Sequence, residues 1–481
     1  MDWRPNREDK KAIYKQIAEY IEHGITTGEF SAGTLLPSER NLAEKLGVNR
    51  STIIAAYEEL ESTGIVSRKK GSGTRVSSDI WGISHKRIPN WGRYVEYGSF
   101  LPNLPLVQLI RKETQEESDI INLSSGELSP ELFPLKEFQT ILTEVPFTAH
   151  LGYDHPQGNL QLRETITDHL KDTKEIETDP ESILITSGAQ QALHLIVECL
   201  LKPGDSVAIE DPSYFYSLPI FKSAGIKTFS LPVDHDGINP EDILDLHKKH
   251  RIRMVFVNPT YQNPTGTVLS NSRRKRLLEL SSELGLPIIE DDPYSLISFN
   301  GEFIPTLKSM DQTGTVLYIS SLTKIVASGL RIGWIVGPRR VIERLADAKQ
   351  QLDFGHSIFP QWIAQNFLRS NEFLLHIKDL QIQLKQRKDQ LIKCLKKNAG
   401  DEVEFLPPKG GIHLWCRINN GRINQKQLLE ESLKKGVAYL PGSVMGSQTN
   451  YIRFTFGRGG CLNIQTGIER FTEALLTLIK D

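Results

Sequence analysis

The spacing of apolar residues changes near residue 120. Before that point apolar side chains recur at helical intervals, as in Ile13, Ile17, Ile21 and Ile25, which predict a first amphipathic helix. Beyond it, short apolar runs alternate with longer amphipathic stretches, as expected of an α/β domain with a mainly parallel sheet. The strands predicted from these runs are residues 183–185, 207–209, 254–257, 288–289, 316–319 and 334–336.

The last hundred residues follow a third pattern. From about residue 380 a long charged helix is expected, followed by shorter strands that include 413–417 and 451–454. This change predicts a smaller α+β lobe over roughly 380–481, within a body of residues 121–481.

Two further helices follow the first one in the N-terminal part. Ser38 can cap a helix that Gly47 ends, and Asn49 can cap another that Gly64 ends. Two short helices that meet at a Gly-Val-Asn turn are typical of a helix-turn-helix, whose later helix enters the major groove with its first residues. The residues expected to meet bases or phosphates there are Asn49, Arg50, Ser51 and Thr52.

A basic hairpin is predicted over residues 65–76. Two short strands flank a glycine turn, and Arg68, Lys69 and Lys70 bring positive charge with no acid among them. Such a wing would bind phosphates and make DNA affinity depend on salt. A three-helix packing module with a solvated charged hairpin is the alternative interpretation.

Composition narrows the picture only slightly. The chain has 481 residues and a formal net charge of −2, so any nucleic-acid signal has to be local. Its four cysteines have no metal-like spacing and are expected to be reduced core thiols. The polar N-terminus does not resemble a signal peptide and no apolar run reaches the length of a membrane span, so we expect a cytoplasmic protein. Residues 77–120 contain scattered Trp and Pro and a charged run, and are predicted to link the head (1–76) to the body.

Lys324 is the main candidate for covalent chemistry. It follows the apolar run 316–319, so it is expected beyond the carboxyl end of a buried strand, where open α/β sheets bind ligands. A lysine in a dry, cation-rich pocket loses its proton readily, and the neutral amine can form a Schiff base with an aldehyde. Ser321 and Arg331 flank it and can bind a phosphate. A lone S-x-x-K is more often an ordinary surface loop, so the interpretation depends on the other strand ends.

Four other predicted strand ends carry matching chemistry. Ser187 and Gly188 precede a helix whose first amides, of Ala189 and Gln190, would attract a phosphate. Tyr214 would place an aromatic ring over the same crevice, and the Asn-Pro pairs around Asn263 can hold its amide toward a ligand. Asp291 can face a protonated ring nitrogen and keep the ring an electron sink, while Tyr294 can reach the ring's phenolic oxygen.

The N-terminal motifs resemble the winged-helix domain of GntR-type regulators. The matching segments are Pro37-Ser38-Glu39-Arg40, Leu42-Ala43, Asn49-Arg50-Ser51-Thr52 and Gly71-Ser72-Gly73-Thr74. The resemblance implies that Arg40, Arg50 and the wing, including Gly71 and Thr74, contact DNA, and that half-site recognition requires a dimer.

The body resembles fold-type I pyridoxal-phosphate enzymes, particularly class I/II aminotransferases, over residues from about 120 to 478. By this resemblance Lys324 carries pyridoxal 5'-phosphate, Asp291 pairs with the pyridine nitrogen, Tyr214 stacks on the ring, and Asn263 and Tyr294 bind its oxygen. The phosphate would be held by Ser187, Ala189, Gln190, Ser321 and Arg331. Tyr153 matches the tyrosine that the family gives to its neighbour's phosphate, and Arg453 matches the arginine that binds the substrate's α-carboxylate. Ala189 replaces a common serine, and Leu128 replaces a common proline beside Gly126, a predicted substrate contact.

A head and a body in this order resemble the MocR-type transcriptional regulators. The resemblance implies a homodimer that binds operator DNA, holds pyridoxal phosphate on Lys324 and senses an amino acid or amine through transaldimination. Three alternatives remain: an active aminotransferase with a DNA-binding head, a regulator that senses pyridoxal phosphate itself, and a DNA-binding protein whose body only dimerises.

Overall fold

The computed structural model describes residues 3–69, 73–77, 98–115, 119–147, 151–447 and 450–480. The chain forms two compact units, Met1–Ser99 and Phe100–Asp481, called the head and the body below. Of the predicted wing residues, Lys70 and Gly71 lie outside the described residues, as does the side chain of Lys69. Within the described ranges, no helix combines the length and the apolar character needed to cross a bilayer.

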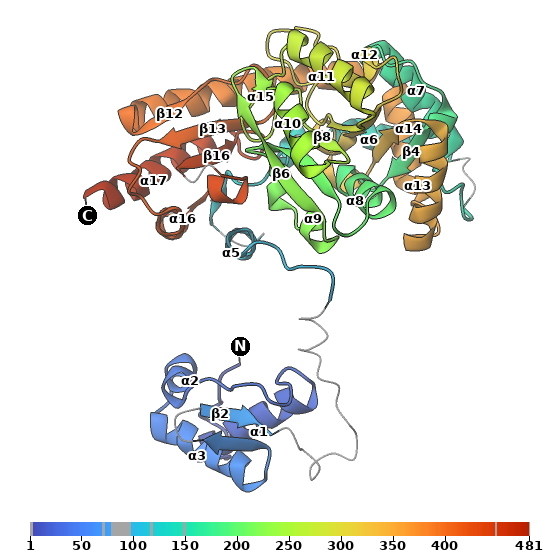
Figure 1. Cartoon of the computed structure of the whole chain (residues 1–481). Coiled ribbons are helices and arrows are strands. Elements are labelled where there is room, and N and C mark those ends of the chain that lie inside the picture. The colour runs from blue at the N-terminus through green and yellow to red at the C-terminus, as the bar shows by residue number, and fades with distance from the viewer. Residues whose placement is uncertain are drawn as a thin grey trace. The chain divides into compact units, whose positions relative to one another are not determined.

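The head is a three-helix unit with a two-stranded hairpin (Figure 1). Its elements are α1 (Ile13–Thr26), α2 (Glu39–Leu46), α3 (Arg50–Ser62), β1 (Val66–Lys69) and β2 (Gly73–Val76). Ser38 caps α2 through its side chain, and Gly47 ends that helix with a left-handed backbone (φ +64°), as predicted. Asn49 occupies the N-cap position of α3, but its side chain makes no capping hydrogen bond. The apolar faces of the three helices close one core around the fully buried Tyr57.

The body is built on an eight-stranded mixed sheet. Its order is β4-β11-β10-β9-β8-β5-β6-β7, and the pairs from β10 through β6 are parallel. β11 runs antiparallel to both of its neighbours, so β4 points in the same direction as β10. The strands are β4 (Ile183–Thr186), β5 (Ser206–Asp211), β6 (Lys227–Asp234), β7 (Gly237–Ile238), β8 (Val255–Val257), β9 (Ile288–Asp291), β10 (Val316–Ser321) and β11 (Gly333–Val336).

Helices pack on this sheet, and a smaller sheet forms the C-terminal lobe (Figure 1). The helices of the body are α5 (Pro105–Glu113), α6 (Leu135–Glu144), α7 (Leu160–Lys174), α8 (Ala189–Leu200), α9 (Ile220–Ser223), α10 (Glu241–His250), α11 (Asn271–Leu284), α12 (Leu307–Met310), α13 (Arg339–Leu352), α14 (Ile358–Arg369), α15 (Asn371–Asn398), α16 (Gln425–Lys434) and α17 (Cys461–Lys480). The small lobe contains a sheet of order β12-β13-β16-β15, with β12 (Val403–Phe405), β13 (His413–Ile418), β15 (Leu440–Pro441) and β16 (Tyr451–Thr455). A short parallel pair joins β3 (Ile121–Asn122) to β14 (Val437–Ala438).

All eight strands predicted by residue range are present, with ends that differ by one or two residues. β6 was not predicted, because Pro232 and a mixed pattern of exposure obscure its period. The long charged helix begins at Asn371, earlier than the expected position near 380, because the apolar residues at its start continue the same helix. The range predicted as a linker, 77–120, includes α5, which belongs to the body, where Leu106 and Val107 pack against Trp415. Cys394 and Cys416 are buried thiols as expected, whereas Cys461 is exposed.

Candidate functional site

A cavity of about 220 Å³ opens at the carboxyl ends of β4, β5, β9 and β10. Parallel strands bring their carboxyl ends to one edge of a sheet, so chemistry that is scattered in sequence converges there. Ten of the predicted cofactor residues line the cavity: Gly188, Ala189, Gln190, Tyr214, Asn263, Asp291, Tyr294, Ser321, Lys324 and Arg331. Ser187 lines the neighbouring cavity instead, together with Gln190 and Arg331.

Lys324 lies in a 3-10 turn, Leu322–Lys324, that directly follows β10. Its Nζ donates a hydrogen bond to the carbonyl oxygen of Gly126. Burial, and after it the nearby Arg453 guanidinium, lowers the pKa of Lys324 to about 8. Near pH 7 about a tenth of the amine is then neutral and nucleophilic, far more than for an ordinary lysine, as Schiff-base formation requires.

Asp291 ends β9 and turns its carboxylate into the cavity. Oδ2 accepts a hydrogen bond from the Tyr214 hydroxyl, whereas Oδ1 is buried and has no partner among the described residues. Burial raises the pKa of Asp291 to about 7. A buried carboxylate with a free oxygen fits a cationic ligand group, because such a group would supply the partner that the fold leaves out.

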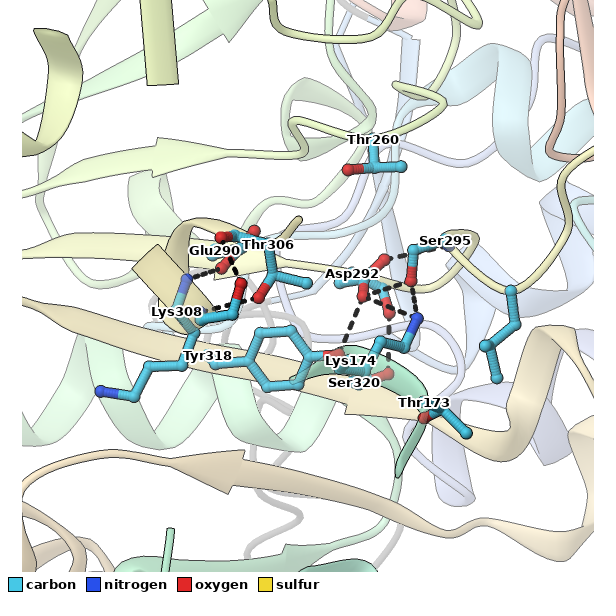
Figure 2. Close-up of polar contacts among 12 residues, drawn as sticks. Thr173, Lys174, Thr260, Glu290, Asp292, Ser295, Thr306, Lys308, Tyr318 and Ser320 are labelled. Atoms are coloured by element: carbon cyan, nitrogen blue, oxygen red, sulfur yellow. Dashed lines mark hydrogen bonds and ion pairs between the residues drawn. The ribbon is translucent and has the colours of Figure 1, made fainter. Parts of the chain in front are cut away.

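The carboxylates on either side of Asp291 are held elsewhere (Figure 2). Glu290 accepts hydrogen bonds from the backbone amides of Leu307 and Lys308 at 2.8 Å each. Asp292 receives the Tyr318 hydroxyl at 2.8 Å and forms an ion pair with Lys174 (Nζ to Oδ2, 3.3 Å). Burial alone would raise the pKa of Asp292, but Lys174 and these hydrogen bonds hold it below the ordinary value. Three consecutive acids thus have separate partners, and only Asp291 has an oxygen left for a ligand.

Tyr294 reaches the cavity from the turn after β9, and a histidine holds its hydroxyl. Tyr294 Oη lies 2.9 Å from His413 Nε2, and His413 Nδ1 lies 3.0 Å from Thr455 Oγ1. All three side chains are buried. The roles of His413 and Thr455 were not predicted from the sequence, because their contact depends on the register in which β13 and β16 pair, and His413 is opposite Thr455 there.

Arg453 is a buried cation with no carboxylate beside it among the described residues. Nη1 donates to Asn263 Oδ1 at 2.9 Å, Nη2 donates to the Ser124 carbonyl oxygen, and Nε has no partner in the part of the chain that the structure describes. Burial lowers the pKa of Arg453 to about 10. A buried guanidinium in this condition is suited to binding an anionic ligand group such as a carboxylate. Gly126, the other predicted substrate contact, lies within reach of the same space: an added Cβ would be 3.4 Å from His413 and 3.8 Å from Lys324 Nζ.

The predicted phosphate end of the cavity depends on two close glycines. Gly188 is the N-cap of α8 with φ +80°, so the first amides of that helix face the cavity. A Cβ on Gly333, which starts β11, would lie 2.8 Å from Gly188 Cα. Arg331 adopts a left-handed backbone (φ +54°) and donates from NH2 to the Ser187 carbonyl oxygen at 2.6 Å. An exposed arginine beside free helix amides makes an anion-binding corner.

Tyr153 does not join this cavity within one chain. Its side chain is 85% exposed and contacts the Phe354 ring, with centroids 5.7 Å apart. Leu151 and Phe359 line a neighbouring cavity of about 460 Å³ beside it and are also exposed. We call Leu151, Tyr153, Phe354 and Phe359 the exposed apolar face.

In the head, the predicted DNA contacts divide into two groups. Arg40, Asn49, Arg50 and Ser51 are exposed at the ends of α2 and α3, and Thr52 is half-buried. Arg50 is bound by Glu39, with its NH2 2.9 Å from Oε2. Arg68 lies 3.7–3.9 Å from the carboxylates of Glu39, Glu58 and Glu61, so acids already surround this wing residue. Thr74 is 7% exposed, and its carbonyl oxygen accepts from the Leu36 amide, so its side chain is inside the head.

Comparisons with known proteins agree with this division of the chain. The family model described as "Bacterial regulatory proteins, gntR family" matches residues 13–76, and that of "Aminotransferase class I and II" matches residues 118–470. The HTH-type transcriptional regulators YisV and YdfD of Bacillus subtilis (strain 168) are similar in sequence. YisV is 38% identical over 99% of both chains, and YdfD is 39% identical over 95% of this chain and 94% of its own. Among solved structures, Pyrococcus horikoshii kynurenine aminotransferase in complex with PMP is similar with a TM-score of 0.76 and 32% identity, over 82% of this chain and 100% of the other.

Proposed function

The chain belongs to the GntR family of bacterial transcriptional regulators in its MocR-type form, with a class I and II aminotransferase body, and we propose that it binds operator DNA as a dimer and senses an amino acid or amine. The aminotransferase fold implies pyridoxal 5'-phosphate as the cofactor. When bound, this group supplies an aldehyde that takes up amines and a ring that withdraws electrons from them. Sensing would consist of transaldimination, in which the effector's amino group displaces that of Lys324.

The observation that carries the proposal is the free oxygen of Asp291. Oδ1 is buried without a partner among the described residues, in the same cavity as a lysine with a lowered pKa. A protonated pyridine nitrogen would satisfy this oxygen and offset the cost of burying the carboxylate. Tyr214 would keep the other oxygen occupied and so orient the acid.

The remaining groups of the cavity have roles that suit the same cofactor. We assign the phosphate to the corner formed by Ser187, Gly188, Ala189, Gln190, Ser321 and Arg331. Tyr294 and Asn263 would bind the ring's phenolic oxygen, and Tyr214 would contact the ring. Ala189 lacks a hydroxyl, so the backbone amides and Arg331 would make the main hydrogen bonds to the phosphate and balance its negative charge.

Arg453 provides the basis for effector recognition. An incoming amino acid would add a carboxylate to a buried guanidinium whose Nε has no partner among the described residues. Arg453 lies on β16 of the small lobe, and its bonds to Asn263 and to Ser124 connect the effector's carboxylate to residues outside that lobe. A ligand that makes such contacts in only one conformation of the body can shift the equilibrium between conformations, which is the requirement for controlling DNA binding.

A dimer would explain the exposed apolar face. Leu151, Tyr153 and Phe359 line one cavity, and Phe354 contacts the Tyr153 ring. All four are 49–85% exposed, which is unusual for large apolar side chains that lie so close together. We propose that a second copy covers them and that each Tyr153 reaches the phosphate corner of its partner. Two heads could then bind two half-sites of an operator through the exposed starts of α2 and α3.

The first test is the absorption spectrum of the purified full-length protein, loaded with pyridoxal phosphate and then titrated with single amino acids and amines. We expect a cofactor band that one amine shifts and that then stays shifted. Lys324→Ala should lose the covalently bound cofactor and the change in DNA affinity caused by that amine, while basal DNA binding remains. A Lys324→Ala protein that still responds normally to the amine would contradict the proposal.

The second candidate is an active aminotransferase, favoured by the 32% identity to the kynurenine aminotransferase and by the complete set of Lys324, Asp291, Tyr214 and Arg453. In that case the cofactor band should decay to that of the amine form of the cofactor, and a 2-oxo acid should restore it. Pyridoxal phosphate itself as the effector would instead change DNA affinity when added to cofactor-free protein without any amine.

A further inference from the structure

The geometry points to His413 and Thr455 as a hydrogen-bonded chain that directs the Tyr294 hydroxyl proton into the cavity, toward the phenolic oxygen of the bound cofactor. The inference rests on the proposed function, because it concerns how this chain's own residues meet pyridoxal phosphate. His413 does not line the cavity itself and acts through Tyr294, so it is a positioning residue.

His413 is surrounded by groups that disfavour a positive charge on its ring. Its ring is buried at the start of β13, between three groups from different elements: Tyr294 from the turn after β9, Lys324 from the turn after β10 and Arg453 on β16. Burial, together with the positive charges of Arg453 and Lys324, holds the pKa of His413 well below its ordinary value. The imidazole is therefore neutral and carries one ring proton, on either Nδ1 or Nε2.

The hydrogen bonds from Thr455 through His413 to Tyr294 can run in two directions. Thr455 Oγ1, 3.0 Å from Nδ1, and Tyr294 Oη, 2.9 Å from Nε2, can each donate or accept. In one arrangement Nδ1–H donates to Thr455, so Nε2 accepts a hydrogen bond from the Tyr294 hydroxyl and the phenol offers the cavity only lone pairs. In the other, Thr455 donates to Nδ1 and Nε2–H donates to Tyr294 Oη, which frees the Tyr294 proton for the cavity. The two arrangements contain the same atoms and the same net charge.

A phenolic oxygen in the cavity favours the second of these two hydrogen-bond arrangements. The second arrangement lets Tyr294 donate to a phenolic oxygen and strengthens that donation, because a phenol that accepts a hydrogen bond becomes a better donor. The first arrangement would leave lone pairs of Tyr294 facing an electron-rich oxygen, which is repulsive. Thr455 can donate this hydrogen bond because its hydroxyl lies in a fully buried position within reach of His413 Nδ1.

The test is a pH titration of the visible absorption of the loaded full-length protein, without amine, as a double-mutant cycle. A hydrogen-bond donor to the phenolic oxygen stabilises the deprotonated form of the bound cofactor, which carries more negative charge on that oxygen. Loss of the donor should therefore move the midpoint of the absorption titration to higher pH. We expect His413→Phe to raise the midpoint by about 0.5–1 pH unit, as for a weakened hydrogen bond to a charged group. In a Tyr294→Phe background the same change should shift it by less than about 0.2 units, because the residue through which His413 acts is gone.

The titration distinguishes the proposed role of His413 from a packing role and from the opposite arrangement of hydrogen bonds. Shifts that add in the two backgrounds would show that His413 acts only on packing, and a midpoint that falls would show that His413 withdraws the Tyr294 proton; either overturns the inference. If His413→Phe does not fold, Thr455→Val and Thr455→Ser replace it. The valine should raise the midpoint by a smaller amount and the serine should restore it, and equal midpoints would overturn the inference. A wild-type protein that binds no pyridoxal phosphate would refute the proposed function as well, whereas additive shifts in a loaded protein would leave that function intact.

Discussion

At the scale of single residues, the cavity and the residues behind its lining include groups whose charged forms are costly until a ligand arrives. Asp291 and Arg453 are both buried, each has one polar atom without a partner among the described residues, and the two side chains do not pair with each other. Buried unpaired charge usually costs stability, so a site of this kind is retained for binding. The cost should therefore be measurable in the protein without cofactor.

Asp291→Asn is predicted to stabilise the cofactor-free protein in a pH-dependent way. Because burial raises the folded-state pKa of Asp291 to about 7, the folded protein binds more protons than the unfolded chain below that pH, and its stability falls as the pH rises toward 7. Asp291→Asn has no carboxyl to ionise and so avoids this loss of stability. Its stability relative to the unchanged protein should therefore grow between pH 5 and 7 and then level off. At pH 8 we expect a gain of roughly 2–4 kcal/mol in the free energy of unfolding.

Urea unfolding at pH 5 and pH 8 measures that gain. Asp172→Asn makes the same chemical change at an exposed position on α7 and serves as the control. An advantage of equal size at the two pH values would contradict the buried, reluctantly ionised carboxyl. In the presence of pyridoxal phosphate the order should reverse, because the asparagine cannot neutralise the ring nitrogen.

At the scale of elements, the cavity depends on contacts behind it. The C-terminal residue of α7, Lys174, ties that helix to Asp292, directly after β9, and Tyr318 on β10 binds the same carboxylate (Figure 2). This cluster holds the end of β9 and the turn after it, from which Asp291 and Tyr294 enter the cavity. A helix end is thereby made part of the framework of the site.

Lys174→Met is predicted to destabilise the protein by about 3–5 kcal/mol, because it leaves the carboxylate of Asp292 buried without its cation. Lys171→Met on the same helix is the matched control, since Lys171 pairs with Glu177 at 3.4 Å but both side chains are mostly exposed, and such pairs contribute little. Denaturant unfolding of both variants measures the difference. Equal losses would mean that the buried pair is no stronger than a surface pair.

The close approach of β11 to the start of α8 leads to a second prediction at this scale. Gly333→Ala would place a Cβ 2.8 Å from Gly188 Cα and push the predicted phosphate corner out of position. We expect pyridoxal phosphate to bind at least about tenfold more weakly, the effect of roughly 1.4 kcal/mol. Gly329→Ala, in the turn Ser328–Leu330 before β11, meets nothing within 4 Å and should bind the cofactor normally, as a fluorescence or absorbance titration can test.

Much of the site could be predicted from the sequence, and the same physical reason explains why some of its residues were not predicted. Lys324, Asp291 and Tyr214 follow apolar runs, and parallel strands bring such positions together whatever their distance in sequence. His413 and Lys174 have no such signal. Their roles come from the pairing of β13 with β16 and from the end of α7 meeting a turn, which are tertiary contacts that no local pattern contains.

The head shows the same limit. Helix boundaries and caps follow from local spacing, as Ser38 and Gly47 illustrate. Whether a basic side chain is free to meet a phosphate depends on its neighbours in space. Glu39 binds Arg50 and also lies near Arg68, and this arrangement joins the start of α2 to the start of α3 and to β1.

At the scale of the whole molecule, a second copy is the expected cover for the exposed apolar face. Phe354→Ser is predicted to weaken the dimer at least about tenfold and to weaken pyridoxal phosphate binding with it, because Tyr153 beside Phe354 would no longer reach the partner's phosphate corner. Sedimentation velocity over a range of protein concentrations measures the first effect. Leu462→Ser, at an 80% exposed position of α17, is the control and should leave the dimer intact. A Phe354→Ser protein with unchanged self-association would refute this assignment of the interface.

Tyr153 also has a genetic consequence. It stands outside the cavity of its own chain, so on the proposed arrangement each site is assembled from two gene products. An allele with Tyr153→Ala and an allele with Lys324→Ala would each be defective alone. Expressed together, they would form mixed dimers in which the Lys324→Ala chain lends its tyrosine to the chain that keeps the lysine. The two alleles should therefore complement each other and restore one working site per mixed dimer.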